Sequence, residues 1–199
     1  IEKLLEKGVA VTARDKKESL GELGAELAAQ GCKLKLGEDY LKDIHEDDIF
    51  RTPGLSPNTP ELVNAVQRGI ELSSEMELFF QTCPSRLIGV TGSDGKTTTT
   101  TLISKFYEAA GRKVHLGGNI GAALLPMLPD VAPEDVAVAE LSSFQLISMR
   151  KSPKIAVVTN VTPNHLVLRR ILRPMQVVVE CAARKSGKLQ QCFQWIFLP

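Results

Sequence analysis

A glycine-rich segment holding one lysine and a run of threonines has the composition and spacing of a nucleotide phosphate loop. It reads Gly-Val-Thr-Gly-Ser-Asp-Gly-Lys-Thr-Thr from Gly89 to Thr98. Its glycines let successive N–H groups turn toward phosphate oxygens, and the helix expected after the loop presents its positive end to the same anion. Lys96 supplies a mobile cation, and the Thr97 hydroxyl suits Mg²⁺. The residues expected to hold ATP are Gly92, Ser93, Asp94, Gly95, Lys96, Thr97, Thr98 and Thr99.

The loop is a variant of the general pattern. The form G-x-x-x-x-G-K-[ST] needs glycine where this chain has Val90. The alternative interpretation is a glycine turn whose lysine and threonine are only solvated. A buried strand before the loop and a helix after it favour the phosphate site.

Two later apolar segments also end in polar residues. Residues 136–140 read as a strand that ends on Glu140, and residues 155–160 as a strand followed by a turn carrying His165. Ligands gather at the carboxyl ends of parallel strands, so both side chains are candidates for a functional site beside the phosphate loop, and Glu140 could bind Mg²⁺ there. An exposed strand-end glutamate and a solvated histidine are the competing interpretations. The turn Gly117–Gly121 exposes the amide of Asn119 and is expected to precede a helix.

These residues need a parallel α/β sheet to position them, and helix and strand patterns do alternate along the chain. The fold class expected is α/β: a partial Rossmann-like domain over residues 1–82, then a phosphate-loop α/β domain over 83–165 that is incomplete. Strands are expected at 9–13, 32–36, 86–90, 113–116, 136–140 and 155–160, and helices before Gly8, before Gly31 and at 97–110. The chain starts with Ile1 and lacks an opening strand and glycine turn, so we expect it to begin inside the first crossover helix.

The bulk composition is that of an ordinary globular protein. The 199 residues are 43% hydrophobic and 24% charged, with a formal net charge of +1, which indicates neither a nucleic-acid partner nor a membrane surface. No apolar run approaches the length of a membrane span, and no signal peptide is visible. The cysteines are spaced unlike zinc ligands, which favours reduced thiols in the cytoplasm. They are Cys32, Cys83, Cys181 and Cys192. We expect a monomer.

The character of the chain changes after His165. Residues 166–199 carry six basic side chains and one acid, Glu180, and they hold the single tryptophan. They show no clear helical or strand period beyond Val177–Val179. One interpretation is a basic tail that folds on a partner; the other, which we favour, is out-of-frame translation.

The motifs together resemble the Mur ligase family, and within it the branch that adds D-glutamate. The resemblance rests on G-V-T-G-S-D-G-K-T-T, G-N-I-G, E-L-S-S-F-Q-L from Glu140 to Leu146, and N-V-T-P-N-H from Asn160 to His165. It covers residues 1 to about 165. The segment that starts at Glu140 is the most specific, because sister ligases carry other residues there.

The resemblance implies roles for residues that the spacing alone does not assign. Lys96, Glu140 and His165 would serve catalysis, and Thr97, Glu140 and His165 would bind Mg²⁺. The substrate would be UDP-N-acetylmuramoyl-L-alanine, and its implied contacts are Asp15, Gly54, Asn119, Ser142, Gln145 and His165. The implied reaction activates the alanyl carboxylate as an acyl phosphate with ATP, and the D-glutamate amine then displaces phosphate in a step of cell-wall synthesis.

Several departures and alternatives remain. The family has Asp where this chain has Val167, and neither its modified lysine nor its third domain is found here. We therefore expect this chain to be an inactive fragment. The alternatives are a folylpolyglutamate-type or other Mur-type ligase, a phosphate-loop kinase or GTPase, and a nucleotide-binding remnant without activity.

Overall fold

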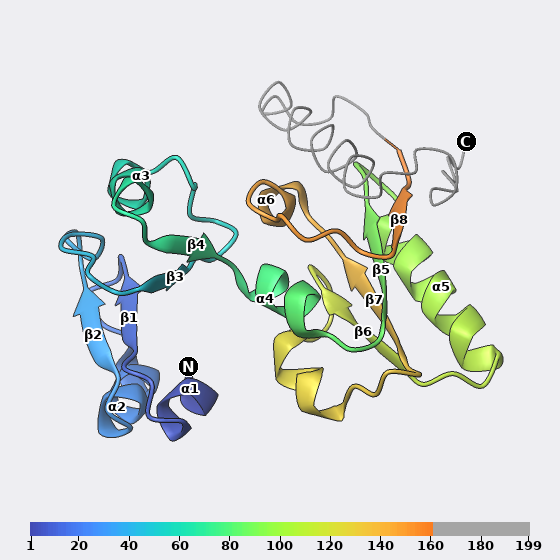
Figure 1. Cartoon of the computed structure of the whole chain (residues 1–199), viewed down its shortest axis with the longest axis horizontal. Coiled ribbons are helices and arrows are strands. Elements are labelled where there is room, and N and C mark those ends of the chain that lie inside the picture. Colours follow the sequence, from blue (N-terminus) through green and yellow to red (C-terminus); the bar gives the residue numbers. More distant parts are fainter. Residues whose placement is uncertain (161–199) are drawn as a thin grey trace. The chain divides into compact units, whose positions relative to one another are not determined.

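The structure, a computed structural model, describes residues 1–160 (Figure 1). These residues form two compact units. One comprises residues 1–49 and 57–72, and the other residues 50–56 and 73–160. The predicted domain limits of 82 and 165 stay predictions. The second unit already includes Ser73, so the helix before Cys83 belongs to it. The predicted tail after residue 165 lies outside the described residues.

The first unit is a small α/β unit built around two parallel strands. The strands β1 (Thr12–Asp15) and β2 (Lys33–Leu36) pair in register from Thr12↔Lys33 to Asp15↔Leu36. Its helices are α1 (Glu2–Glu6), α2 (Gly21–Ala29) and α3 (Pro60–Gln67). The first predicted strand, 9–13, is misplaced, since β1 begins at Thr12. Two further strands, β3 (Asp48–Phe50) and β4 (Glu71–Ser73), pair with each other. Within each of these strands the chain leaves the first unit and enters the second.

Arg14 on β1 fixes the segment that follows β2. Its guanidinium donates to the carbonyls of Tyr40 (2.8 Å) and Lys42 (2.9 Å) and to the Glu46 carboxylate (2.8 Å). Partial burial raises the pKa of Glu46, but hydrogen bonds from Arg14 and nearby groups outweigh it and lower this pKa from 4.5 to about 2.

The second unit is a parallel four-stranded sheet with strand order β6-β7-β5-β8. The strands are β5 (Arg86–Thr91), β6 (Val114–Gly118), β7 (Val136–Glu140) and β8 (Ile155–Val158). The helices are α4 (Glu75–Thr82), α5 (Lys96–Ala109), α6 (Ser143–Leu146) and the 3-10 helix η1 (Leu125–Asp130). The predicted parallel α/β class is confirmed.

Alternate side chains of the sheet enter two separate cores. Val136 and Val138 of β7 pack with Ile88 and Val90 of β5 on one face, and Ile103 of α5 packs against them. Successive strand residues point to opposite faces, so the intervening residues form the other core. That core joins strand residues to α4 and to the region of η1, and its buried members are Met76, Phe79, Phe80, Leu87, Leu124, Ala137, Ala139, Leu141 and Leu146. Figure 1 shows α4 and α5 on opposite sides of the sheet.

Near the amino ends of the strands, a buried hydrogen bond ties β6 to the loop before β7. His115 Nε2 lies 2.8 Å from Asp135 Oδ2, and both side chains are buried. The hydrogen bond with His115 lowers the pKa of Asp135, and a second one from the Ala132 N–H acts in the same direction. This end of the sheet is thus held by its own polar contacts, apart from the phosphate loop at the other end.

The region after Gly121 differs from the expectation. We expected a helix directly after the Gly117–Gly121 turn, but only the short 3-10 helix forms, from Leu125. Pro129 lies inside it, and proline cannot donate an N–H to a longer α-helix. The structure also contains α3 and α4, which the sequence patterns did not predict.

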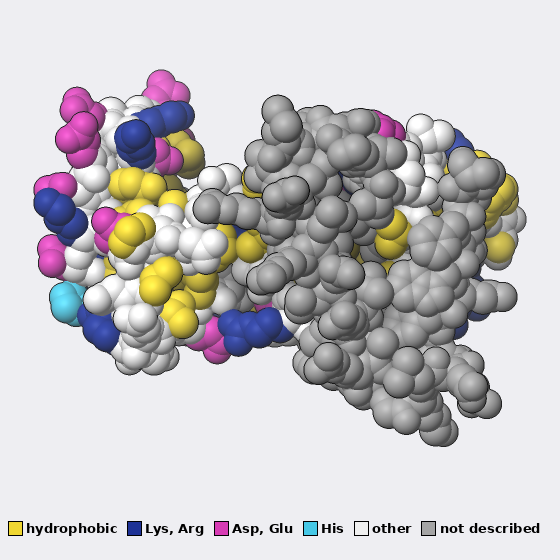
Figure 2. Space-filling view, turned by 90° about the horizontal axis from the view of Figure 1, so that it is seen from above, with side chains coloured by type: hydrophobic (Ala, Val, Ile, Leu, Met, Phe, Trp, Pro, Cys, Tyr) yellow, Lys and Arg dark blue, Asp and Glu magenta, His cyan; other side chains and the backbone are white. Residues whose placement is uncertain are grey.

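Within residues 1–160, no helix combines the length and apolarity needed to cross a bilayer. On the face shown in Figure 2, acidic and basic side chains are interspersed over the first unit, rather than gathered into a large field of one sign.

Acid should lower the folding stability of the wild-type protein, because Glu46 becomes protonated. Because the folded-state pKa of about 2 lies below 4.5, the stabilisation is complete above pH 4.5 and is lost as the pH falls toward 2. The ion pair between Glu46 and Arg14 is partly exposed. We therefore expect Glu46→Gln to lower the free energy of unfolding by about 1 kcal/mol near neutral pH, with a smaller difference at about pH 3. Urea titrations followed by circular dichroism measure this. Asp39→Asn, in an exposed pair with Lys42, is the control. A Glu46→Gln effect that does not shrink in acid would contradict the assignment.

Candidate functional site: the carboxyl edge of the second sheet

The register of the strands brings four strand ends to one edge. Val90 of β5 and Gly118 of β6 both lie opposite Glu140 of β7, and Thr91 lies opposite Val158 of β8. All pairs are parallel, so the segments that follow these strands emerge at the same edge. The strand ends that carry the predicted site therefore lie side by side. They lead into the predicted phosphate loop, Asn119, Glu140 and the turn after β8.

The predicted phosphate loop lies between β5 and α5, as expected. It spans residues 92–95, and α5 begins at Lys96. The Lys96 ammonium donates to the main-chain carbonyls of Gly92 (2.9 Å) and Ser93 (3.0 Å). The lysine thus folds back over its own loop, where its charge lies beside the first turn of a helix whose N–H groups favour an anion.

The end of β8 braces this loop. The main-chain oxygen of Asn160 accepts the Ser93 N–H (3.0 Å), and its side-chain Oδ1 accepts the Asp94 N–H (2.9 Å). Thr159 donates its hydroxyl to the Asp94 carbonyl. The fit is so close that a Cβ at Gly92, whose φ is +140°, would lie 2.1 Å from the Thr159 hydroxyl oxygen. Glycine is therefore required at position 92.

Glu140 is a buried carboxylate held by two neighbours. Its side chain is 2% exposed; Oε2 accepts the Thr97 hydroxyl (2.8 Å) and Oε1 accepts the Asn119 amide (3.0 Å). Gly118 lets β6 approach, because a Cβ there, at φ +105°, would lie 2.4 Å from the Glu140 carbonyl oxygen. The structure thus brings Thr97, Asn119 and Glu140 together, and their roles in binding stay predictions.

Ser142 and Gln145 form a capping box at the start of α6. The Ser142 hydroxyl oxygen accepts the Gln145 N–H (3.3 Å), and Gln145 Oε1 accepts the Ser142 N–H (2.8 Å). Gln145 also lines a cavity of about 280 Å³, together with Arg51, Thr52 and Gly118. Of the predicted contact residues, Gln145 lines this cavity of the second unit.

Two other predicted contacts, Asp15 and Gly54, are not among the residues that line this cavity. Asp15 ends β1 in the first unit, where its carboxylate accepts the Lys17 N–H at 2.8 Å. Gly54 is exposed in the turn closed by the Leu55 N–H and the Thr52 carbonyl (3.1 Å), within the second unit. His165 lies outside the described residues.

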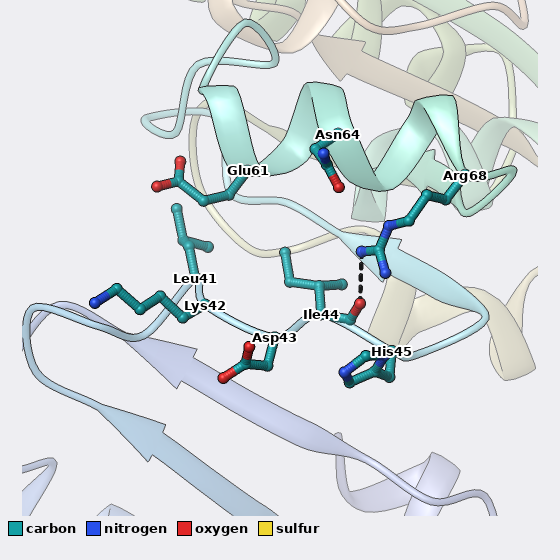
Figure 3. Close-up of a pocket in the computed structure, with 8 residues that line it drawn as sticks. All are labelled: Leu41, Lys42, Asp43, Ile44, His45, Glu61, Asn64 and Arg68. Atoms are coloured by element: carbon teal, nitrogen blue, oxygen red, sulfur yellow. Dashed lines mark hydrogen bonds between the residues drawn. The ribbon is translucent and has the colours of Figure 1, made fainter.

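A second cavity, of about 320 Å³, belongs to the first unit and contains none of the predicted residues (Figure 3). Two of its charged groups have local partners: Arg68 donates to the Ile44 carbonyl (2.7 Å), and Asp43 pairs with Lys35.

Comparison with known proteins agrees with this geometry. The family model described as "Mur ligase middle domain" matches residues 90–168. The chain is 51% identical over 176 residues to a UDP-N-acetylmuramoylalanine--D-glutamate ligase of Ruminiclostridium cellulolyticum, a match over 87% of this chain and 38% of that protein. The chain belongs to the Mur ligase family.

Two further matches are consistent with this membership. A ligase of the same description from Symbiobacterium thermophilum is 51% identical over 166 residues, which is 82% of this chain and 36% of that Mur ligase. The crystal structure of UDP-N-acetylmuramate:L-alanyl-gamma-D-glutamyl-meso-diaminopimelate ligase from Neisseria meningitides aligns with a TM-score of 0.53 at 18% identity, over 89% of this chain and 62% of that one. This structural likeness supports the fold. The chain thus spans well under half the length of these two curated Mur ligases.

Residues that the sequence patterns missed include Asn160, Thr159 and Arg51. Asn160 stood in the N-V-T-P-N-H motif but was given no role. The signal available was its position at the end of a buried strand, next to the loop that it braces.

Replacing Asn160 by alanine should loosen the phosphate loop at one point. The variant keeps the main-chain oxygen that holds Ser93 but loses the side-chain oxygen that holds Asp94. We expect the Asp94 amide to exchange about tenfold faster and the Ser93 amide to change much less, with a cost in global stability of about 1 kcal/mol. Amide exchange measured by NMR provides both readouts, and Ser93 is the internal control. Equal acceleration at both amides would mean that the side chain does not brace the loop.

Proposed function

We propose that this chain carries the nucleotide- and metal-binding part of a ligase that joins D-glutamate to UDP-N-acetylmuramoyl-L-alanine at the expense of ATP. The observation that carries the proposal is the buried Glu140 beside the Thr97 hydroxyl, next to the loop that holds Lys96. The names of the relatives supply the substrates. Placement in the cytoplasm and a monomeric state remain predictions.

The loop fits ATP by its charge and by its backbone. Lys96 has a compact ammonium that lies at hydrogen-bond distance from two loop carbonyls, from which it can move to phosphate oxygens. The first turn of α5 offers main-chain N–H groups, since the first N–H groups of a helix lack partners within it. The brace from Asn160 holds the loop in this shape before the nucleotide arrives.

The Thr97–Glu140 pair fits Mg²⁺ by its donor chemistry. Hydroxyl and carboxylate oxygens are the hard ligands that Mg²⁺ prefers, usually with one or two carboxylates and the nucleotide phosphates completing its shell. Within residues 1–160, no cluster of three or more histidine, cysteine or acidic side chains is placed for a metal. A magnesium ion bound by Thr97 and Glu140 would neutralise charge on the nucleotide phosphates.

The proposed reaction has two balanced steps. A carboxylate oxygen of the alanyl group bonds to the γ-phosphorus of ATP as ADP leaves, and the D-glutamate nitrogen then bonds to the carboxyl carbon as phosphate and a proton leave. Residues of this chain contribute mainly by position and charge: Lys96 at the phosphates and Gln145 in the cavity of the second unit.

Lys96→Ala should remove most of the MgATP affinity and leave the fold intact. The ammonium contacts only loop carbonyls in the described structure, so the α5 helix and the sheet do not depend on it. Calorimetric titration of the purified 199-residue protein with MgATP measures the loss, which we expect to exceed about tenfold. Lys105→Ala, on the same helix, is the control. Unchanged binding in the Lys96 variant would refute the phosphate-loop assignment.

Glu140→Gln should weaken nucleotide binding more with Mg²⁺ than without it. The amide keeps the shape of the carboxylate but loses the charge that attracts a dication. Parallel titrations with MgATP and with ATP in excess chelator give the two affinities. If both fall by the same factor, Glu140 acts on the loop and not on the metal.

A further inference from the structure

Arg51 is a buried cation whose hydrogen-bond acceptors within residues 1–160 are all uncharged. Arg51 is the first residue after β3, and it is 4% exposed. Burial lowers the pKa of its guanidinium. The ion pairs found within residues 1–160 do not include Arg51, and its Nε has no hydrogen-bond partner. Because a buried charge without a counter-ion is costly, its presence needs an explanation.

The guanidinium joins two segments that lie far apart in the sequence. One nitrogen, Nη1, donates to the carbonyls of Thr52 (3.1 Å), Pro53 (3.3 Å) and Leu55 (2.8 Å). The other, Nη2, donates to the Phe144 carbonyl (3.0 Å) and to the Ser148 hydroxyl (2.7 Å). The planar fork therefore spans the turn that contains Gly54 and the segment that contains α6.

Both segments belong to the cavity of the second unit. Arg51, Thr52 and Pro53 line it from the turn, and Gln145 lines it from α6. The Phe144 carbonyl is one of the last carbonyls of α6, which have no partner within a helix. Arg51 satisfies that carbonyl and, in the same contact, sets the distance between the turn and Gln145.

We propose that Arg51 is a positioning residue, which sets the shape of this cavity by clamping the Thr52–Leu55 turn to the α6 segment. The identity of the cavity's ligand rests on the proposed function, but the clamp itself does not. The clamp acts through geometry, because one guanidinium holds donors to both segments in a fixed plane. A lysine keeps the charge but carries a single point donor group, so it cannot span both.

The α6 segment also has a second anchor, which keeps the test interpretable. The buried Glu77 carboxylate on α4 accepts the N–H groups of Arg150 (2.8 Å) and Lys151 (3.1 Å). Loss of the Arg51 clamp should therefore free the turn and α6 locally, while Glu77 still holds the residues after them.

The first experiment tests the clamp without any ligand. Hydrogen–deuterium exchange by mass spectrometry compares wild type with Arg51→Lys. Peptides covering residues 52–56 and 143–148 should both exchange about tenfold faster, and peptides from β5 and α5 should not change. Ser148→Ala removes one acceptor and should give a smaller effect, and Arg68→Lys in the first unit is the matched control. Faster exchange in the turn alone, or no change, would overturn the proposal. A second variant, Arg51→Gln, guards against a local effect of the lysine.

The second experiment measures what the clamp does for binding. Calorimetry with UDP-N-acetylmuramoyl-L-alanine should show about tenfold weaker binding in Arg51→Lys, whereas MgATP affinity should stay within about twofold of wild type. A merely destabilised protein would lose both affinities together, and that result would count against a positioning role. Unaltered affinity for the UDP compound would do so as well. If the wild type does not bind the UDP compound, the proposed substrate fails, and the exchange experiment alone decides the fate of the clamp.

Discussion

The candidate site depends on the need to satisfy one buried carboxylate. Glu140 lies at the end of β7 with almost no access to solvent, so both of its oxygens need donors. Those donors come from the first turn of α5 and from the residue that follows β6. The strands must therefore end at the same level, and β6 must approach β7 closely enough that only Gly118 fits. The phosphate loop, in turn, takes its position from the strand and helix that this pairing fixes.

Much of the second unit was predictable from sequence, because local pattern decides it. The strands at 86–90, 136–140 and 155–160 read as short apolar runs, and the structure places strands there with small changes of boundary. The loop was predictable because its glycines and Lys96 follow a strand and precede a helix. Glu140 was predictable as a candidate because strand ends in a parallel sheet share one edge.

The remainder depends on contacts between distant residues or on weak local signals. Asn160 braces a loop 66 residues away, and Arg51 reaches Phe144 and Ser148, 93 and 97 residues away. No periodicity encodes such pairs. The helix α4 did carry a local signal, since Ser74 caps it by accepting the Glu77 N–H. It was hidden because Phe79 and Phe80 enter the core side by side and blur the helical period. In the first unit, Val9 opened the apolar run that predicted a strand at 9–13, but Val9 is exposed and the strand begins later, at Thr12.

The brace from β8 has a consequence for the order of folding. The loop between β5 and α5 is short, yet its hydrogen bonds to Asn160 join residues that are 66 positions apart. Long-range contacts form only after the entropy of the intervening chain has been overcome, so they form late. On the ribosome, β5, α5, β6 and β7 all emerge before the residues that give the phosphate loop its shape. A nascent chain can therefore build most of its sheet while the loop has no fixed form.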